Sequence, residues 1–358
     1  MARTRVLIVE DSLTVRRRLR EVLEADPQIE IVGEAEDGRR AIELCEQLRP
    51  DVITMDMMLP HITGLGATEH IMAHFPTPIL ICSSSVNRAE VFKTYDALAA
   101  GAVDVLEKPS GDDPDGHWER RFVETVKLVS RIRVITHLRA RLGALGRPQS
   151  GPVVAVDHRA RARETCDIVA IGASTGGPGT VVEILRALPA SFPLPLLLVL
   201  HINEPFAANF ADWLDGQGPL RVSYANDGEP LSAAAGRVVM APPDRHLVVR
   251  NRRLRLTLDA ERNSCRPSID ELFESLAEEY GSSVTACLLT GMGRDGAAGL
   301  LEIRKAGGLT IAQDEASSVV FGMPREAVRL GAAMRVLPPG QIGALLASLA
   351  AVTREVTP

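Results

Sequence analysis

A serine in a glycine-rich turn is the first residue of this sequence whose setting suggests chemistry. Ser174 lies in the segment Gly-Ala-Ser-Thr-Gly-Gly (residues 172–177), between an apolar strand pattern and a helical pattern. A serine on such a turn presents its hydroxyl above the sheet, and the small neighbours let a substrate approach. A turn of this kind can also hold a phosphate at the helix N-terminus. The turn alone therefore leaves a nucleophile and a phosphate site as alternatives.

Two residues further along the chain would complete a set for acyl transfer. His201 follows the next apolar strand, so a strand–helix–strand connection would bring it to the same sheet edge as Ser174. Asp295 lies at another strand–loop–helix junction, where its simplest role is to cap the following helix. Together, a serine nucleophile, a histidine base and an aspartate that fixes the imidazole tautomer form a hydrolase triad. The chain order Ser-His-Asp differs from that of α/β hydrolases and indicates a separate lineage.

A second group of charged residues lies near the N-terminus, again where strands should end. Glu10 and Asp11 follow the first apolar run, Asp56 follows the third, and Lys108 follows the fifth. Carboxylates at such an edge suit Mg²⁺, and a lysine opposite them can pair with a phosphoryl group. Any one of these acidic residues could simply cap a helix. Their combination predicts a metal-dependent phosphoryl-transfer site.

The elements that must position these residues form two alternations of strand and helix, which predict parallel sheets covered on both faces. In the first, we expect strands over 5–10, 29–32, 52–55, 79–82 and 103–106, and helices from Leu13 and over 39–48, 68–74, 89–99 and 118–142. In the second, we expect strands over 168–171, 196–200, 238–240, 284–289 and 309–312, and helices over 180–188, 269–279 and 296–306.

The segment 238–258 instead alternates short strands with turns, which predicts an antiparallel hairpin at one edge. Between the two alternations, glycines, prolines and arginines recur and predict a flexible linker. We therefore expect three regions, namely a first domain over 1–125, a helix extension and linker over 126–165, and a second domain over 166–353. The fold class is α/β, with two doubly wound parallel-sheet domains.

Composition agrees with two globular domains in a reducing compartment. The 358 residues are 46% hydrophobic and 24% charged, enough to build two cores. The five cysteines are scattered without metal-ligand spacing, and no apolar run is long enough for a signal peptide or a membrane helix. The net charge of −6 argues against nucleic acid as the main partner. We expect a soluble, cytoplasmic protein.

Residues 1–125 resemble a response-regulator receiver domain, which has a flavodoxin-like fold. The resemblance implies phosphorylation at Asp56, within Thr-Met-Asp-Met-Met-Leu-Pro, and Ser83 and Lys108 as the residues that contact the phosphate. It also implies a Mg²⁺ site made of Glu10, Asp11, Asp56 and the backbone carbonyl of Met58. A cis peptide bond before Pro109 is expected as well.

Three features depart from the receiver pattern, and one of them is the segment Ile62-Thr63-Gly64, which stands where Met-Asp-Gly is usual. Glu10 stands where aspartate is commoner, which metal binding tolerates. Val105 stands where an aromatic ring often moves on activation, so the details of the switch stay open.

Residues 166–350 resemble the catalytic domain of the chemotaxis protein-glutamate methylesterases, which are also glutamine deamidases. The motifs that carry the resemblance are the turn at 172–177, Leu-Thr-Gly-Met-Gly-Arg-Asp-Gly-Ala (289–297), and the run 310–327 from Thr-Ile-Ala-Gln-Asp-Glu to Pro-Arg-Glu-Ala. With the receiver, the resemblance covers nearly the whole chain.

This second resemblance implies roles for five residues. Ser174 is the nucleophile, His201 the base and Asp295 its orienting partner. The oxyanion rests on the backbone N–H of Met292, with help near Thr175. No cofactor is implied for ester hydrolysis.

Taken together, the resemblances imply a phosphorylation-regulated hydrolase that demethylates glutamate methyl esters on methyl-accepting chemoreceptors and so serves sensory adaptation. The implied partners are those receptors and a CheA-type histidine kinase as phosphodonor, with no nucleic acid and no membrane insertion.

Glutamine deamidation stays open, because Asn203 and Glu204 stand where Pro-Pro is usual and Cys265 where histidine is frequent. The alternatives are the same hydrolase in a non-motility receptor pathway and a non-catalytic response regulator that acts by binding.

Overall fold

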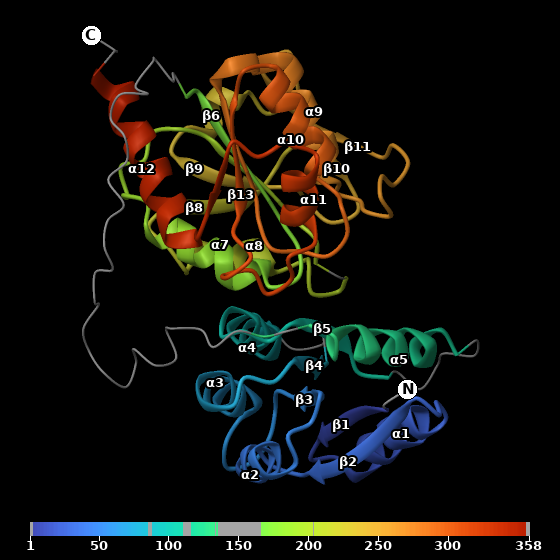
Figure 1. Ribbon diagram of the computed structural model, residues 1–358. Helices are drawn as coiled ribbons and strands as arrows, with labels where there is room; N and C mark the ends of the chain where they lie inside the picture. The colour runs from blue at the N-terminus through green and yellow to red at the C-terminus, as the bar shows by residue number, and fades with distance from the viewer. Residues whose placement is uncertain are drawn as a thin grey trace. The chain divides into compact units, whose positions relative to one another are not determined.

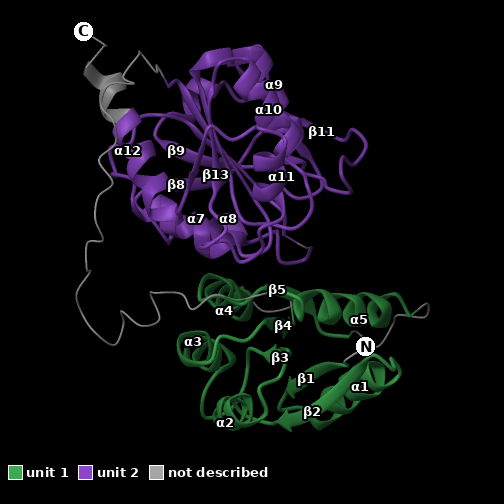
Figure 2. Ribbon diagram, viewed as in Figure 1, with its two compact units in different colours: residues 1–148 green, residues 149–358 purple. Residues whose placement is uncertain are grey.

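The chain folds into two compact units, residues 1–148 and 149–358 (Figure 2). The structure is a computed structural model that describes residues 3–84, 88–109, 116–132, 134, 166–202 and 204–355, and side chains as far as residue 349. Most of the expected linker lies outside the described residues. Each unit is described below by itself.

Unit 1 is built on a parallel sheet whose strand order, within the described residues, is β2-β1-β3-β4-β5 (Figure 1). The strands are β1 (Thr4–Val9), β2 (Ile29–Ala35), β3 (Val52–Asp56), β4 (Ile79–Ser83) and β5 (Asp104–Glu107). The helices are α1 (Leu13–Glu24), α2 (Gly38–Leu48), α3 (Gly64–His74), α4 (Arg88–Ala99) and α5 (His117–Val129). Helices α1 and α5 cover one face, and α2, α3 and α4 cover the other (Figure 1).

The strands and helices expected in unit 1 are all present, but the last helix is shorter than the pattern over 118–142 suggested. Helix α5 ends at Val129, where the N–H groups of Arg131 and Ile132 bond to carbonyls three residues back and tighten the chain into a turn. The rest of that expected helix lies almost entirely outside the described residues.

Unit 2 contains a longer parallel sheet, with the strand order β14-β13-β12-β6-β7-β9-β8 in the described part of the unit. Its strands are β6 (Ile168–Ala173), β7 (Leu196–Leu200), β8 (Arg221–Tyr224), β9 (Arg237–Met240), β12 (Val284–Leu288), β13 (Leu309–Gln313) and β14 (Arg335–Leu337). Every residue of the central strands β6, β7 and β12 is buried. They are therefore the continuous apolar runs that a parallel sheet covered on both faces requires.

Helices cover both faces of this sheet, with α7 and α12 packed together on one face and α9, α10 and α11 gathered on the other (Figure 1). The helices are α7 (Gly177–Arg186), α8 (Phe210–Asp215), α9 (Ile269–Tyr280), α10 (Ala297–Lys305), α11 (Met323–Arg329) and α12 (Pro339–Glu355). Two 3₁₀ turns lie at Leu231–Ala234 and Gly281–Ser283.

The antiparallel hairpin is present as β10 (His246–Arg250) and β11 (Arg253–Thr257). Its two turn residues, Asn251 and Arg252, both have positive φ, as a tight two-residue hairpin turn requires. The hairpin forms a sheet of its own rather than an edge of the large sheet, and it packs against α9. Val249 N–H donates to Ser275 Oγ at 3.0 Å, and Arg252 N–H donates to Glu279 Oε1 at 2.9 Å.

In each sheet, the chain builds outward from its first strand, β1 or β6, first on one side and then on the other. The direction of strand addition therefore reverses beside that first strand. In unit 2 the chain leaves β6 towards β7 on one side and returns to β12 on the other. In unit 1 the corresponding reversal lies between β1 and β3. Ligands of open parallel sheets bind at the carboxyl ends of the strands beside such a reversal, which is where all the sequence-predicted residues should lie.

Helices α9 and α10 pack closely against each other at Gly299. We predict that a methyl group at this position disrupts their packing. A Cβ there would lie 2.7 Å from Phe273 Cβ and 2.9 Å from Asp270 O. Gly299→Ala should lower the free energy of unfolding by ~1–3 kcal/mol, through overpacking. The matched change in α12, Gly340→Ala, meets nothing closer than 3.6 Å and should be neutral or stabilising by ~1 kcal/mol at most.

Urea unfolding of both full-length variants, followed by circular dichroism, measures this difference. Equal stabilities would show that the α9–α10 contact is not the tight packing described.

Candidate active sites at the carboxyl ends of two sheets

Ser174 lies between the end of β6 and the start of α7, as the sequence predicts. Its N–H donates to Thr290 O at 3.0 Å, and its carbonyl accepts from Gly177 N–H at 2.7 Å. Gly176 in the same turn has a φ of 74°, and a Cβ there would lie 2.4 Å from Val319 Cβ. The turn therefore needs a glycine at this position, both for its backbone conformation and for space.

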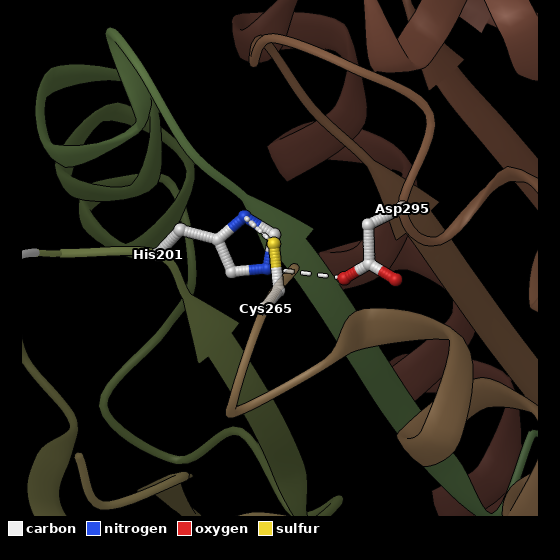
Figure 3. A group of neighbouring side chains, drawn as sticks. All are labelled: His201, Cys265 and Asp295. Carbon is white, nitrogen blue, oxygen red and sulfur yellow. Dashed lines mark hydrogen bonds and ion pairs between the residues drawn. The ribbon is translucent and has the colours of Figure 1, made fainter. Parts of the chain in front are cut away.

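His201 lies at the end of the neighbouring strand, and its N–H donates to Ala173 O at 3.0 Å. Its imidazole lies between two other side chains (Figure 3). Nε2 is 3.0 Å from Asp295 Oδ2, and Nδ1 is 3.8 Å from Cys265 Sγ. Since Asp295 engages Nε2, Nδ1 is the nitrogen left to exchange a proton with another group.

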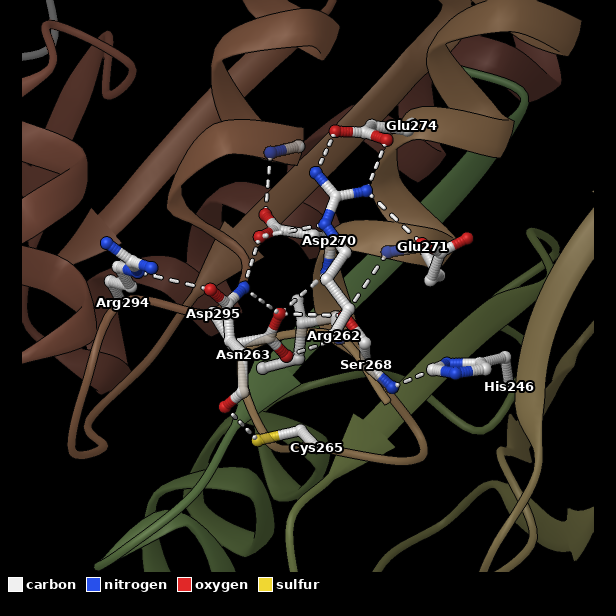
Figure 4. Close-up of polar contacts among 12 residues, drawn as sticks. His246, Arg262, Asn263, Cys265, Ser268, Asp270, Glu271, Glu274, Arg294 and Asp295 are labelled. Carbon is white, nitrogen blue, oxygen red and sulfur yellow. Dashed lines mark hydrogen bonds and ion pairs between the residues drawn. The ribbon is translucent and has the colours of Figure 1, made fainter. Parts of the chain in front are cut away.

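Asp295 is buried, and its carboxylate accepts hydrogen bonds from several donors in addition to His201 (Figure 4). Ser268 Oγ donates at 2.7 Å, Ile269 N–H at 2.6 Å and Asn263 Nδ2 at 3.1 Å. Burial alone would raise the pKa of Asp295, but these donors and His201 outweigh it and lower the pKa to about 2. Asp295 is therefore a firmly ionised and firmly oriented carboxylate.

The simple expectation that Asp295 caps its own following helix is wrong. The N-cap of α10 is Gly296, which provides no side-chain cap. Asp295 instead accepts from the first N–H groups of α9, at Ile269 and Asp270, where the positive end of that helix favours a carboxylate. The same carboxylate oxygen, Oδ2, accepts from both Ile269 N–H and the His201 imidazole.

The same carboxylate changes the acidity of His201. Burial alone would lower the pKa of the imidazole, but the hydrogen bond to Asp295 and the contact with Cys265 outweigh burial and raise the pKa to about 9.

Among the hydrogen bonds of the described residues, none joins Ser174 to His201. The structure brings the ends of their two strands together, but the side chain next to Nδ1 is Cys265. Catalytic hydrogen bonds are often long or absent before substrate binds and tighten in the complex. The serine–histidine contact therefore stays a prediction.

The loop after β12, which carries Met292, lies against Ser174. A Cβ on Gly291 would be only 2.7 Å from Ser174 Cβ, and Met292 is partly exposed. Thr175 is tied to the same loop, because Thr290 Oγ1 donates to Thr175 O at 3.0 Å. Both residues expected to hold an oxyanion thus belong to the segments that border Ser174, and their role stays a prediction. Sequence reasoning did not single out Thr290, whose buried hydroxyl joins these segments.

The turn 262–265, which presents Cys265, was also missed by sequence reasoning. The N–H groups and carbonyls of Arg262 and Cys265 bond to each other, and the two residues between them, Asn263 and Ser264, have φ values of 53° and 61°. Arg262 forms an ion pair with Glu274, which fixes the turn to α9 (Figure 4). The local signal of this turn in the sequence was Asn263 itself, because asparagine is one of the residues that tolerate positive φ.

A cavity of about 250 Å³ opens beside the end of β7. It is lined by apolar residues such as Leu200 and Tyr224 and by the charged residues Glu204, Asp244 and Arg266. Glu204 and Arg266 belong to the two segments that depart from the family pattern, so these departures border a space next to His201. Asn203 lies outside the described residues.

In unit 1, the predicted carboxylates and lysine meet at the ends of β1, β3 and β5. Lys108 Nζ lies 2.9 Å from Asp56 Oδ1 and 3.0 Å from Glu10 Oε2. Glu10 and Asp56 are buried, Asp11 is exposed, and one oxygen of each lies within 4.8 Å of the others. Burial and the charge of Asp56 raise the pKa of Glu10 to about 7, although Lys108 opposes the shift. This crowding of carboxylates fits a hard divalent cation.

Met58 and Ser83 lie beside these carboxylates with different contacts. Met58 N–H donates to Asp56 Oδ1 at 3.3 Å. Ser83 is buried at the end of β4, where its Oγ donates to Glu90 Oε1 at 3.0 Å and accepts from Thr94 Oγ1 at 3.1 Å. The hydroxyl is thus held by α4 in this structure, and Glu90 was not predicted from the sequence.

The expected cis bond before Pro109 is not found. The cis bonds of the described residues precede Pro205 and Pro267. Lys108 N–H continues the pairing of β5 with β4 by donating to Ser83 O at 3.0 Å, which already directs Lys108 to the site.

Known proteins resemble this chain along nearly its full length. The family described as CheB methylesterase matches residues 169–346, and the family described as response regulator receiver domain matches residues 6–114. A protein-glutamate methylesterase/protein-glutamine glutaminase of Nitrosospira multiformis is 44% identical over 98% of both chains. A protein of the same description from Myxococcus xanthus is 42% identical over 96% of both chains. The crystal structure of the Thermotoga maritima CheB methylesterase catalytic domain is 38% identical, covers 51% of this chain and 98% of its own, and gives a TM-score of 0.49.

The contact between His201 and Asp295 predicts an imidazole that titrates well above the ordinary histidine range. An NMR pH titration of the full chain, with the His201 signal assigned through His201→Gln, should give a midpoint near 9 rather than 6.5. Asp295→Asn should lower the midpoint well below 9, because burial remains while the hydrogen-bonded carboxylate that raises the pKa is lost. Asp244→Asn, an exposed control, should leave it unchanged. A wild-type midpoint of 6.5 or less would contradict the described pair.

Proposed function

The chain belongs to the family of the protein-glutamate methylesterases/protein-glutamine glutaminases, and we propose that it removes methyl esters from glutamate side chains of chemoreceptors under the control of phosphorylation at Asp56. The observation that carries this proposal is the hydrogen bond between His201 and Asp295. Asp295 is buried and also accepts from Ile269 N–H, and the pair lies beside the turn that presents Ser174. The pair together with the adjacent Ser174 turn favours a hydrolase over a response regulator that acts only by binding.

In the proposed reaction, the fraction of His201 that has lost its Nδ1 proton to solvent is the active form. Ser174 Oγ attacks the ester carbonyl while Nδ1 of this form takes the hydroxyl proton. Asp295 keeps the other proton on Nε2 and stabilises the imidazolium that forms. The tetrahedral intermediate collapses to an acyl-enzyme, and methanol leaves with the proton from Nδ1. Water then attacks the acyl group by the same route and releases the glutamate side chain and Ser174. The same steps with ammonia as the leaving group would deamidate glutamine.

The oxyanion of each tetrahedral intermediate would be held by Met292 N–H, with help near Thr175. The close approach of Gly291 to Ser174 supports this arrangement, because it brings the backbone that follows Gly291 to the nucleophile. Donors of this kind typically lower the barrier by ~3–4 kcal/mol.

In unit 1, we assign phosphoryl transfer from a CheA-type histidine kinase to Asp56. Lys108 would pair with the phosphoryl group, and Ser83 would leave Glu90 to contact it. The charge that Mg²⁺ supplies when bound would reduce repulsion between the carboxylate and the incoming group. The residues assigned to hold this ion are Glu10, Asp11, Asp56 and the carbonyl of Met58.

The domain limits belong to the proposal too, with a receiver over 1–125, an extension and linker over 126–165, and a methylesterase domain over 166–353. No helix among the described residues is both long and apolar enough to cross a membrane. We propose that the protein works in the cytoplasm on the cytoplasmic part of its receptors.

We predict that Ser174→Ala lowers the rate of methanol release from methylated receptor by at least ~10³-fold, because the nucleophile is lost. Ser348→Ala, which removes an exposed serine from α12, should leave the rate unchanged. Circular dichroism and urea unfolding check that both variants are folded. Substantial activity in folded Ser174→Ala would rule out serine as the nucleophile and direct attention to the thiol of Cys265.

We also predict that Asp56→Asn abolishes two properties of the full chain. These are Mg²⁺-dependent labelling by radioactive acetyl phosphate and the acceleration of methanol release by that phosphodonor. An amide cannot accept the phosphoryl group at neutral pH. Asp51→Asn, a change of the same kind at an exposed position of unit 1, should retain both. Stable labelling of Asp56→Asn would place the phosphorylation site elsewhere.

A further inference from the structure

Cys265 is a thiol for which the proposed reaction has no role. All five cysteines lie within the described residues, and four of them are buried, namely Cys45, Cys82, Cys166 and Cys287. Cys265 alone is partly exposed, and its Sγ lies 3.8 Å from His201 Nδ1. The accessible thiol of the chain is thus at the imidazole of the active site.

The spacing of these two atoms matches that of two ligands on one metal ion. Zinc binds cysteine sulfur at about 2.3 Å and histidine nitrogen at about 2.0–2.1 Å, and at bond angles of about 110–120° the two ligand atoms are then about 3.6–3.8 Å apart. The observed 3.8 Å falls in this range without any movement of the side chains. The ligand atoms of His201, Cys265 and Asp295 also lie within 4.8 Å of one another.

Asp295 prepares the imidazole to act as a ligand. Its hydrogen bond keeps a proton on Nε2, so Nδ1, on the side of Cys265, is the nitrogen that can give up its proton to a metal ion (Figure 3). Metal-bound histidines usually donate their second N–H to a carboxylate in this way, which fixes the tautomer and the ring orientation. The carboxylate is itself immobilised by Ser268 and Ile269.

The thiol is also held in place. Cys265 closes the turn that begins at Arg262, with backbone hydrogen bonds in both directions of 2.9 and 3.2 Å. Asn263 in this turn donates to both Asp295 and Asp270 (Figure 4). The turn and the imidazole are therefore positioned by one carboxylate, so the distance between the two ligand atoms is set by a rigid frame.

We propose that Cys265 Sγ and His201 Nδ1 form an inhibitory binding site for a thiophilic divalent cation of the Zn²⁺ class. On binding, the thiol of Cys265 and Nδ1 of the His201 imidazolium each release a proton to solvent. The sulfur and nitrogen lone pairs then bind the ion, and water fills the remaining positions. No electron is transferred. Thiolate and imidazole select such an ion over Mg²⁺, which prefers oxygen ligands. Two protein ligands make the site weaker than a structural four-ligand site and therefore reversible.

Binding would block the hydrolase because the ion occupies Nδ1. This is the nitrogen that takes the proton of Ser174 in the proposed reaction, so the inhibitory part of the inference rests on the proposed function. The binding part rests only on the geometry of Cys265, His201 and Asp295. The two parts can be tested separately.

Cobalt binding tests the site without reference to activity. Co²⁺ is added to the full chain in excess Mg²⁺, which occupies the carboxylates of unit 1, and absorption is recorded. We expect a thiolate-to-cobalt charge-transfer band that saturates at one ion per chain. Cys265→Ser and His201→Gln should each lose the band. His70→Gln should keep it, although it removes one of two stacked histidines on α3 that could also bind metal. A wild-type chain without the band, or a band that survives in Cys265→Ser, overturns the site.

Zinc titration of methanol release tests the inhibition. We expect inhibition that EDTA reverses, and an inhibition constant at least tenfold higher in Cys265→Ser, with each variant normalised to its own metal-free rate. Equal inhibition of both proteins overturns the site, and cobalt binding without zinc inhibition overturns the inhibitory role. If the metal-free full chain releases no methanol, the proposed function fails, and the cobalt experiment alone decides the metal site.

Discussion

The buried carboxylate of Asp295 is the constraint on which the active site of unit 2 depends. A carboxylate removed from water costs several kcal/mol unless donors surround it, and breaking such an arrangement is strongly destabilising. The donors here come from separate parts of the chain, with Ser268 and Ile269 at the start of α9, Asn263 in a turn, and His201 after β7. The hydrogen bonds to the Asp295 carboxylate therefore join four segments, namely its own loop, the start of α9, the Asn263 turn and the end of β7. The geometry of the imidazole follows from the need to satisfy this charge.

A second buried carboxylate, that of Asp270, interacts with Asp295. Asp270 receives Gly299 N–H at 2.7 Å and lies near Arg262, yet burial and the charge of Asp295 raise its pKa to about 6. The negative field at His201 comes from the carboxylate of Asp295. This field favours a proton on the imidazole, and it equally favours the positive imidazolium of an acyl-transfer transition state. A strong base and a cation-attracting site are thus two consequences of one arrangement.

Much of this arrangement follows from sequence, because a parallel sheet brings the ends of its strands to one edge. Ser174, His201 and Asp295 each follow a strand that local apolar patterning reveals, and the structure places all three at that edge. The turn with Asn263 and Ser264 could not be predicted in this way. Its shape depends on positive backbone angles and on side chains distant in sequence, neither of which has a periodic signal. Strands β8 and β14 were not predicted from the sequence either, because they are short and only partly buried and so have no clear apolar pattern.

The two sites of the chain apply the same electrostatic principle with different ligand chemistry. In unit 1, one ammonium group, that of Lys108, faces the carboxylates of Glu10 and Asp56, so negative charge remains for a cation to neutralise. Oxygen ligands of this kind suit a hard ion that keeps part of its water. In unit 2, the imidazole and thiol of His201 and Cys265 present nitrogen and sulfur, which bind softer ions more strongly. The ligand sets of the two proposed sites therefore differ in kind rather than only in strength. Replacing the thiol with a hard donor would remove that distinction.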